Sequence, residues 1–271
     1  HKSGFNIEVI HSQSNSYYID TQTFDLAELK VLIDAVSSSK FITQKKSQEL
    51  INKLLSLTSE HSAALLRRHV YVEGRVKSEN EKGYYIVDII NEAIDTGRKI
   101  RFQYVDYSTK KRKVLRHGGE PYVVSPYALI WDGDYYYVVG FSEKRGIVQS
   151  FRLDRFYKTP ELLEEDAIPA PKSFNINAYA QSVFRMYDTD KPVDVELQCK
   201  NQIANAIIDR FGKAIQIREI DDQHFNVTVK VCASPTFFRW VFGWNGDMKI
   251  IGPENVKNEY RLMCRAGLDE V

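Results

Sequence analysis

Two neighbouring segments of the chain combine aromatic side chains with arginines. Residues 135–141 and 148–156 are rich in aromatic and β-branched residues, and the charged, glycine-containing segment 142–146 separates them. This pattern predicts two antiparallel strands joined by a hairpin loop. Such a surface suits nucleic acid, because bases stack on aromatic rings and an arginine can hold a phosphate with two hydrogen bonds.

The alternation of side chains along the second strand separates its arginines from its core residues. Phe151 and Leu153 should face the core, so Arg152 points outward, to solvent or to a ligand groove. Arg155 sits at the end of the strand, where the alternation can break. For Asp154, a salt bridge to a neighbouring residue and a role in ligand binding are equally good explanations.

The first strand leaves two alternatives open. Tyr135 and Tyr137 share one face and Tyr136 takes the other. One face must belong to the core, so the exposed side carries either Tyr136 alone or the other two tyrosines together.

The densest basic stretch of the chain reads Lys-Lys-Arg-Lys at 110–113 and continues to Arg116 and His117. Solvated charges at a hairpin turn explain it most simply, and a phosphate-facing patch is the sharper alternative. The whole chain gives no electrostatic argument for nucleic acid, because 37 Lys and Arg residues meet 36 Asp and Glu residues, a net charge of +1.

Composition places the chain among cytoplasmic globular proteins. Its 271 residues, 43% of them hydrophobic, are enough for two or three compact units. No apolar run is long enough for a membrane span, and there is no signal peptide. Cys199, Cys232 and Cys264 are odd in number and widely spaced, which argues against disulfides and a cysteine zinc site and for a reducing cytoplasm.

No catalytic motif stands out. The chain has no phosphate-binding Gly-Lys-Ser/Thr loop, no His-Glu-x-x-His and no Gly-x-Ser-x-Gly, and the six histidines are scattered. His61 and His69 would lie two turns apart on a helix, too far for one metal. We therefore expect no enzyme, no cofactor and no metal.

Helical patterns precede the strands. Residues 24–36 repeat apolar side chains at helical spacing behind an Asp25–Glu28 capping box, and Thr43 and Ser59 are expected to cap two more helices. Residues 84–96 form a fourth helix, which Gly97 ends. Strands are expected at 99–107, 112–124 and 127–131 before the aromatic hairpin, and five short antiparallel strands with one helix suit a small closed barrel.

A second mixed unit follows the acidic, Pro-Ala-Pro-containing segment 161–171, which marks a domain boundary. Strands are expected at 192–200, 215–220, 225–233 and 249–251. Helices are expected at 201–211, from Ser234-Pro235 to 242, and at 254–265. The order βαββαβ with a terminal helix predicts a ferredoxin-like sandwich.

The hairpin region resembles the WYL domain of bacterial transcription regulators. The resemblance rests on Trp-Asp-Gly-Asp-Tyr-Tyr-Tyr-Val-Val-Gly at 131–140, Phe-Arg-Leu-Asp-Arg at 151–155 and Val-Ser-Pro-Tyr-Ala-Leu at 124–129. The family's name triplet, Trp-Tyr-Leu, falls on 135–137, where only the central Tyr is kept. Residues 24–43 resemble the helical connector of these regulators, and 238–244 with 252–256 resemble their C-terminal extension.

This resemblance implies an α+β chain of four parts. Residues 1–20 would be a remnant of the wing of a winged helix-turn-helix, and 21–75 the helical connector. Residues 82–165 would be the Sm-like, antiparallel small β-barrel, and 172–271 the ferredoxin-like extension. Because the chain opens at His1 without Met, we expect an N-terminally truncated fragment that lacks the recognition helix.

The resemblance also implies a function and a site. The WYL domain would bind a nucleic-acid or nucleotide effector, since single-stranded DNA is a known ligand of the family. Tyr136, Arg152 and Arg155 are carried over as ligand contacts, and the weaker candidates are His117, Tyr104 and Ser125. The protein would be a homodimeric, cytoplasmic regulator that contacts DNA through the missing module. The alternatives are a single-stranded nucleic-acid-binding protein without a regulatory role and a nucleotide-processing enzyme.

Overall fold

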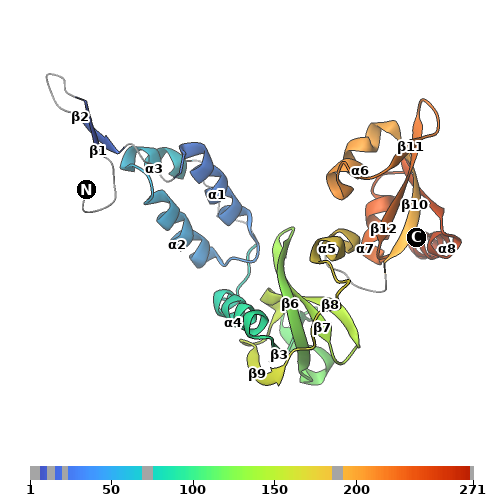
Figure 1. Ribbon diagram of the computed structural model, residues 1–271, viewed down its shortest axis with the longest axis horizontal. Coiled ribbons are helices and arrows are strands. Elements are labelled where there is room, and N and C mark those ends of the chain that lie inside the picture. The colour runs from blue at the N-terminus through green and yellow to red at the C-terminus, as the bar shows by residue number, and fades with distance from the viewer. Residues whose placement is uncertain (1–6, 11–15, 20–23, 69–75, 185–191, 269–271) are drawn as a thin grey trace.

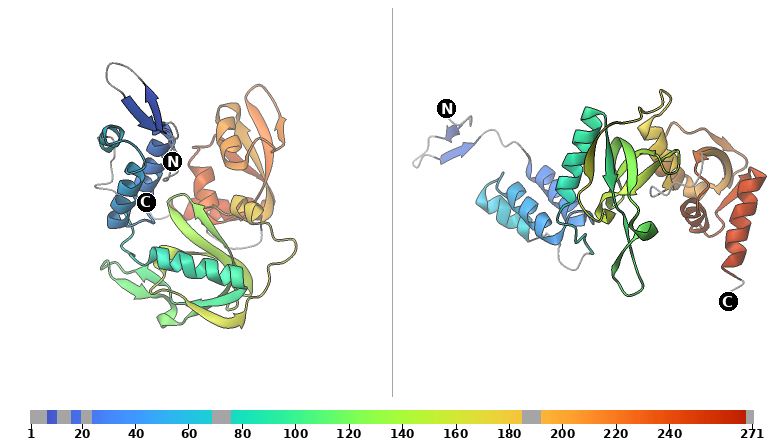
Figure 2. Two further views of the ribbon diagram at one scale, coloured as in Figure 1. Left: turned by 60° about the vertical axis from the view of Figure 1, so that its left-hand side comes forward. Right: turned by 90° about the horizontal axis from the view of Figure 1, so that it is seen from below.

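The computed structural model describes residues 7–10, 16–19, 24–68, 76–184 and 192–268, and it combines helices with antiparallel sheets (Figure 1). The class is therefore α+β, as predicted. The chain runs from a hairpin through three helices to a first mixed unit and then to a second one (Figures 1 and 2). None of the described helices is both long and apolar enough to cross a membrane.

The first part of the chain contains the hairpin and the connector helices. Strands β1 (Ile7–Ile10) and β2 (Ser16–Ile19) pair antiparallel. Helices α1 (Leu26–Ser38), α2 (Gln44–Leu55) and α3 (Glu60–Arg67) follow. They enclose a small apolar core of Leu29, Ile33, Ile51, Leu55, Ala63 and Leu66. The assignment of the hairpin to a winged-helix wing stays a prediction.

The predicted caps explain where the connector helices begin. The backbone N–H of Asp25 donates to Glu28 at 2.8 Å and completes a capping box. The hydroxyls of Thr43 and Ser59 each accept a hydrogen bond from the backbone N–H three residues further on, both at 3.2 Å. Each bond satisfies an N–H that has no partner inside its helix.

Lys77 ties the segment after the connector to the end of α1. Its Nζ donates to the carbonyl oxygens of Val36 at 3.3 Å and Ser39 at 2.8 Å, and to the hydroxyl of Ser47 at 2.9 Å. The last carbonyls of a helix lack partners within the helix, and the helix dipole favours a cation there. One lysine therefore joins α1, α2 and the chain that leads to the next unit.

The first mixed unit is a helix packed on an antiparallel sheet. Helix α4 (Gly83–Thr96) ends at Gly97, whose φ of 63° is the left-handed geometry that glycine adopts easily. The strand order is β8-β7-β6-β3-β9, and every neighbouring pair is antiparallel. The strands are β3 (Arg98–Phe102), β6 (Tyr122–Asp132), β7 (Tyr135–Ser142), β8 (Ile147–Arg152) and β9 (Glu161–Asp166).

Two strand predictions in this unit were wrong. The expected strand 112–124 is divided into β5 (Lys113–Leu115), the short helix η1 (Arg116–Gly119) and the start of β6, which continues through 127–131. Strand β4 (Val105–Tyr107) also separates from β3 and pairs with β5 in a hairpin of its own. The glycines and the left-handed His117 of η1 turn the chain between the two sheets.

The acidic segment predicted as a domain boundary is in part the edge strand β9. Its carboxylates pair with cations of β3: Arg101 bonds Glu161 at 2.7 Å, and Lys99 bonds Glu165 at 2.8 Å. A run of acidic residues looks like a linker in sequence, because the partners that hold it lie some 60 positions upstream.

Gly140 lets β6 and β7 approach each other closely. A Cβ at this position would lie 2.4 Å from the carbonyl oxygen of Ser125 and 2.8 Å from Val124 Cγ1. The register shifts here, between Pro126 and Ala128. Any side chain would therefore push the two strands apart.

Aromatic rings fill the core beneath α4. Phe102 stacks on Phe156 with ring centroids 4.0 Å apart and meets the edge of Phe151 at 5.2 Å. The fully buried Ile86 and Ile90 of α4 pack on the same cluster. This core packs the sheet against α4, and the residues described below line a hollow.

The second mixed unit has the predicted order of elements. Strands β10 (Val193–Lys200), β11 (Ile217–Glu219), β12 (His224–Val231) and β13 (Met248–Gly252) form an antiparallel sheet in the order β11-β12-β10-β13. The helices are α6 (Ala204–Phe211), α7 (Pro235–Phe242) and α8 (Glu254–Ala266). Helix α5 (Ile176–Ser182), before this sheet, was not expected.

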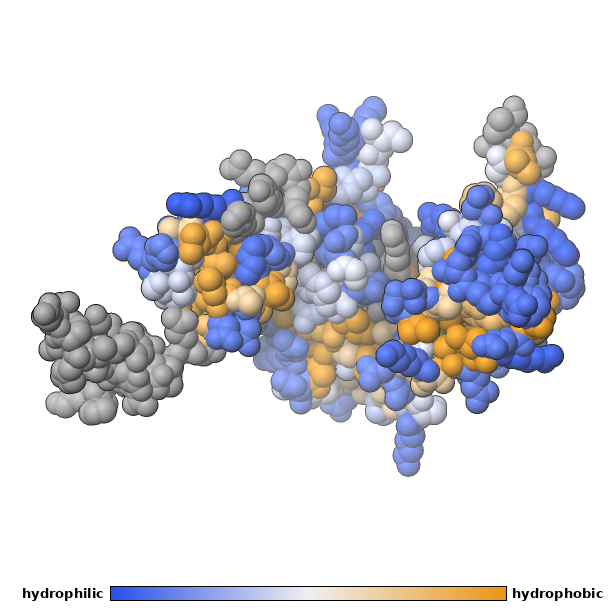
Figure 3. All heavy atoms as spheres, turned by 90° about the horizontal axis from the view of Figure 1, so that it is seen from above, coloured by the Kyte–Doolittle hydropathy of each residue, from blue (hydrophilic) through white to orange (hydrophobic). Residues whose placement is uncertain are grey.

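Surface hydrophobicity is uneven. Figure 3 shows hydrophobic residues grouped on the connector helices and along the second mixed unit. Exposed examples are Val31 on α1, Phe242 at the end of α7 and Leu262 on α8. Charged and polar residues cover most of the remaining visible surface.

Candidate ligand-binding site

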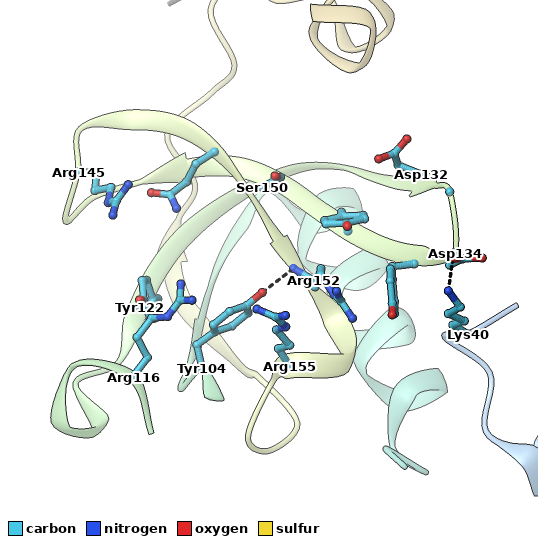
Figure 4. Close-up of a pocket in the computed structure, with 14 residues that line it drawn as sticks. Lys40, Tyr104, Arg116, Tyr122, Asp132, Asp134, Arg145, Ser150, Arg152 and Arg155 are labelled. Carbon is cyan, nitrogen blue, oxygen red and sulfur yellow. Dashed lines mark hydrogen bonds and ion pairs between the residues drawn. The ribbon is translucent and has the colours of Figure 1, made fainter. Parts of the chain in front are cut away.

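A cavity of about 800 Å³ opens on the first mixed unit, on the side of the sheet that carries Arg152 (Figure 4). Its volume falls in the range of small-molecule sites. The lining residues are Lys40, Tyr104, Arg116, Tyr122, Asp132, Gly133, Asp134, Tyr135, Tyr137, Arg145, Gln149, Ser150, Arg152 and Arg155. Cations and tyrosines thus dominate its wall.

The cations surround the cavity. In Figure 4, Arg145 and Arg116 lie at one end, Lys40 lies at the other, and Arg152 and Arg155 lie between them. These five cations face two lining carboxylates, and one of these, Asp134, pairs with Lys40 at 2.7 Å. The side of the cavity around the arginines is therefore the part that attracts an anion.

Arg152 is held in place from three sides. Its backbone N–H donates to the Tyr104 hydroxyl at 3.0 Å, and its guanidinium donates to both oxygens of Asp154, at 3.1 and 2.7 Å. The guanidinium carbon lies 3.3 Å from the centre of the Tyr135 ring. Burial lowers the pKa of Arg152, but the hydrogen bonds and charge of Asp154 outweigh it, so the pKa lies above its ordinary value. The guanidinium stays charged at any physiological pH.

Arg155 reaches the cavity because the chain leaves the strand before it. Strand β8 ends at Arg152, and the short helix η2 (Leu153–Arg155) turns the next residues. Leu153 is fully buried, and Arg155 comes round to the same side as Arg152 (Figure 4). The break in alternation that the sequence left open at this strand end therefore occurs.

Asp106 organises two of the arginines. It accepts hydrogen bonds from Arg116 at 2.8 and 2.9 Å and lies 3.5 Å from an Nη atom of Arg155. The hydrogen bonds from Arg116 lower the pKa of Asp106 below its ordinary value. Arg116 also lies over the ring of Tyr104, at 5.1 Å from its centre. The Asp106 carboxylate therefore contacts both guanidiniums, but it does not itself line the cavity.

Two tyrosines of the wall, Tyr104 and Tyr137, are neutral hydrogen-bonding groups. Tyr104 is 5% exposed, and burial raises the pKa of its hydroxyl well above the ordinary range. Burial also raises the pKa of Tyr137, to about 12. Both hydroxyls therefore keep their protons at neutral pH, and each has a hydrogen to donate to an anionic ligand.

Two lining residues keep unused polar groups. The buried Oε1 of Gln149 accepts no hydrogen bond from any residue that the structure describes. Within the same described set, Arg145 forms no ion pair. A buried polar atom without a partner is costly, so a ligand that donates to Gln149 would remove a penalty already present in the folded protein.

Tyr136 does not lie in this cavity, which corrects its grouping with the arginines. It takes the opposite face of β7 and packs against the edge of Phe41, with ring centroids 5.6 Å apart, and against Trp131 at 5.5 Å. The alternative pair, Tyr135 and Tyr137, lines the cavity instead. Phe41 of the connector packs against the face of β7 that carries Tyr136, so protein atoms occupy that face.

Of the weaker candidates, Tyr104 lines the cavity and two others do not. Ser125 is fully buried, and its hydroxyl accepts a hydrogen bond from the backbone N–H of Ile168 at 2.9 Å. His117 lies in η1 with a φ of 51°, its ring 6.1 Å from that of Tyr122. Neither belongs to the lining residues.

Sequence reasoning missed two cations of the wall, Lys40 and Arg145. Arg116 belongs to the basic stretch that was considered as a phosphate-facing patch, whereas Arg145 appeared as an ordinary loop charge. Lys40 comes from the end of the connector, about 100 positions before the arginines of β8 and η2. No local pattern can connect residues at that separation.

The described residues contain no cluster of three or more His, Cys, Asp or Glu side chains placed to hold a metal ion. What the cavity offers is fixed positive charge, neutral hydroxyl donors and flat rings. This set is chemically suited to anions that carry a planar group, because charge and hydrogen bonds can hold an anion and a ring can stack on the tyrosines.

Comparison with known families identifies two domains. The WYL domain matches residues 85–160, which includes most of the lining residues, and the WCX domain matches residues 191–268. A comparison with curated protein sequences finds no match.

Two solved structures are similar to the chain. One is proteasome accessory factor B/C (PafBC) of Arthrobacter aurescens, 17% identical, with a TM-score of 0.36 over 94% of this chain and 37% of that one. The other is a CRISPR Cas-related protein, 14% identical, with a TM-score of 0.43 over 90% of this chain and 70% of that one. The chain thus spans little more than a third of the length of PafBC.

Proposed function

We propose that this chain is the effector-sensing part of a DNA-binding transcription regulator. The proposal starts from its being a WYL-domain protein, in which a WCX domain follows the WYL domain. The effector would be a nucleotide or a single-stranded nucleic acid bound in the cavity of the WYL domain. Catalysis is not part of the proposal.

The observation that carries the proposal is the position of Arg152 and Arg155 beside Tyr135 and Tyr137 in one cavity. Two guanidiniums can hold a phosphate, and the rings beside them suit a base. Arg152 is already ordered by Asp154 and Tyr104, so little side-chain entropy is lost when a ligand binds.

The strand that lines the cavity also contacts the connector. On β7, Tyr135 and Tyr137 face the cavity, while Tyr136 touches Phe41 of the connector. Lys40 lines the cavity and pairs with Asp134 at the turn before β7. A ligand that prefers one arrangement of Lys40 would shift the connector with it, which is what a sensor requires.

The partners expected from the sequence belong to the same proposal. A cytoplasmic homodimer would contact operator DNA through winged helix-turn-helix modules, and ligand binding would change their spacing. By itself, residues 1–271 should bind duplex operator DNA weakly or not at all, because the net charge is +1. Sub-micromolar, sequence-specific duplex binding at physiological salt would contradict this expectation.

The finer fold names are also proposed. The strand order β11-β12-β10-β13 with helices α6 and α7 between strands supports a ferredoxin-like WCX unit. For the WYL unit, an isolated bridge from Tyr104 to Phe156 brings the end of β3 toward the end of β8, which supports an Sm-like barrel. A crystal structure of the full-length protein would test both.

The arginines provide the test. Single-stranded oligonucleotide binding and melting temperature would be measured for Arg152→Ala, Arg155→Ala and the double variant. Each lost charge-assisted contact should cost roughly 1.5–3 kcal/mol, so the double variant should bind on the order of a hundredfold or more weakly. Affinity should also fall with added salt, because phosphate contacts release counterions.

Arg218→Ala is the matched control, since Arg218 is exposed on β11 of the other unit and the substitution removes the same charge. It should leave affinity unchanged. Unchanged affinity of the cavity variants, together with a large drop in melting temperature, would show that Arg152 and Arg155 only hold the fold together.

A further inference from the structure

The hairpin of β4 and β5 stands out from the WYL domain. Its three-residue strands pair from Val105 with Leu115 to Tyr107 with Lys113, and they have no other strand partner among the described residues. Figure 2 shows this green hairpin projecting from the sheet in its right-hand view. Its turn, 108–112, is exposed except for the partly buried Ser108.

Four consecutive cations occupy the tip and the start of β5: Lys110, Lys111, Arg112 and Lys113. Lys111 has a φ of 58°, the left-handed geometry of a tight turn, and all four cations are exposed. Within the part of the chain that the structure describes, none of the four forms an ion pair with a carboxylate. Their charge is therefore available to a partner.

Strand β3 of the same domain shows the opposite arrangement. The cations of β3 are all neutralised: Arg98 pairs with Asp166, Lys99 with Glu143 and Glu165, and Arg101 with Glu161. Cations that stabilise the fold of this domain thus have carboxylate partners. The one carboxylate of the hairpin, Asp106, pairs with Arg116 and Arg155, and residues 108–113 contain none. The four cations at the tip therefore point to a use outside the fold.

The hairpin leads directly into the cavity. Strand β5 is followed by Arg116, which lines the cavity wall (Figure 4). At about 3.4 Å per residue, strand β5 places Lys113 roughly 10 Å from Arg116, and the other three cations lie further out in the turn. An exposed ring, Tyr107, lies along this path with the Nζ of Lys113 6.0 Å from its centre. A basic track with an aromatic side chain therefore runs from the cavity to the tip.

We propose that the β4–β5 hairpin holds the phosphate backbone of a nucleic-acid strand whose terminal nucleotide occupies the cavity. The effector is then a single-stranded oligonucleotide longer than the cavity, and a mononucleotide fills only part of the site. This inference rests on the proposed function, because it extends the same cavity.

The experiment uses the whole chain and two probes, a 5′-phosphorylated thymidine dinucleotide and a long oligothymidylate. The hairpin variant carries Lys110→Gln, Arg112→Gln and Lys113→Gln. The control carries Arg218→Gln, Lys230→Gln and Lys249→Gln, three exposed cations of the WCX unit, so the net charge changes equally. Arg152→Ala reports on the cavity.

The hairpin variant should lose about two units of the slope of log K against log salt for the long strand, and on the order of fiftyfold in affinity near physiological salt. Its affinity for the dinucleotide and its melting temperature should match those of the control variant. The control variant should bind the long strand nearly as well as the wild-type protein does.

Three outcomes would overturn the inference. If the hairpin variant binds the long strand as the control does while Arg152→Ala weakens it, the hairpin is not a contact but the proposed function stands. If Arg152→Ala changes neither probe, the proposed function fails as well. If polyglutamate competes as strongly as the long strand, the hairpin attracts any polyanion and is not a nucleic-acid surface.

Discussion

The two faces of strand β7 differ in what they are built to contact. One face, with Tyr135 and Tyr137, borders a cavity lined by arginines. The other, with Tyr136, packs against Phe41 in an edge-on ring contact and against Trp131 in a tilted one. The three tyrosines are identical in type and consecutive in sequence, yet one face remains open to a ligand and the other is filled by the connector.

A single strand can therefore carry a proposed ligand contact on one face and a structural contact on the other. The connector face resembles a protein core, where the energy comes from burying rings. The cavity face keeps charged and polar groups that protein atoms only partly satisfy. Substitutions on the two faces should therefore change different measurements, and the following predictions test that separation.

The largest effect is expected for Phe41→Ala. Phe41 is 6% exposed and belongs to the core of the WYL domain, although the connector carries it. Loss of this ring should cost about 3–5 kcal/mol of unfolding free energy. Denaturant unfolding would measure this, and oligonucleotide affinity under native conditions should change little.

Phe242→Ala is the control for this prediction, because Phe242 is 64% exposed at the end of α7. It should change the unfolding free energy by less than about 0.5 kcal/mol. A Phe41→Ala protein of normal stability would show that the connector is only loosely seated on the WYL domain.

The single alanine variants of Tyr135 and Tyr136 should differ in what they change: one affects oligonucleotide affinity and the other the unfolding free energy. Tyr136→Ala removes a partly buried ring and should lower the unfolding free energy by about 2 kcal/mol, with little loss of affinity. Tyr135→Ala removes the ring under the Arg152 guanidinium and should weaken oligonucleotide binding roughly two- to thirtyfold.

Tyr136→Phe serves as the conservative control and should retain near-normal stability, since the ring contacts remain. The distinction between the faces is lost if Tyr136→Ala weakens binding as much as Tyr135→Ala does at equal stability. That result would restore Tyr136 as a ligand contact, as the family resemblance implies.

The smallest effect concerns Asp106 and pH. Because its hydrogen bonds with Arg116 lower its pKa in the folded protein, Asp106 contributes stability above the ordinary aspartate pKa of about 3.9. The contribution disappears as the pH falls through the lower, folded-state pKa. The side chain is 44% exposed, so solvent screening should keep the contribution below about 1 kcal/mol.

Unfolding free energies of the wild-type protein and Asp106→Asn, measured from neutral to acidic pH, would reveal this contribution. The gap between them should be greatest near neutrality and close at low pH. Asp194→Asn, at an exposed position of β10, is the control and should show no such gap. A gap that widens as the pH falls would contradict the assigned ion pairs.

Local signals predicted much of the framework. The caps at Thr43, Ser59 and Ser234 and the stop at Gly97 are where the sequence places them, because capping depends on residues within one turn. The two strands of the aromatic hairpin were predicted as well, since alternation and turn residues are local. The resemblance to WYL-domain regulators was confirmed by the domain matches.

Local patterns in the sequence thus predicted most of the elements of this protein and the two possible faces of β7. It could not choose between the faces, because the choice depends on Phe41, which lies almost a hundred positions upstream. Lys40 in the cavity wall and the pairing of β9 with β3 depended in the same way on distant partners. Such contacts follow only from the tertiary structure. Whether a side chain is buried depends on the residues around it, and the spacing of residues along the chain does not identify which distant residue packs there.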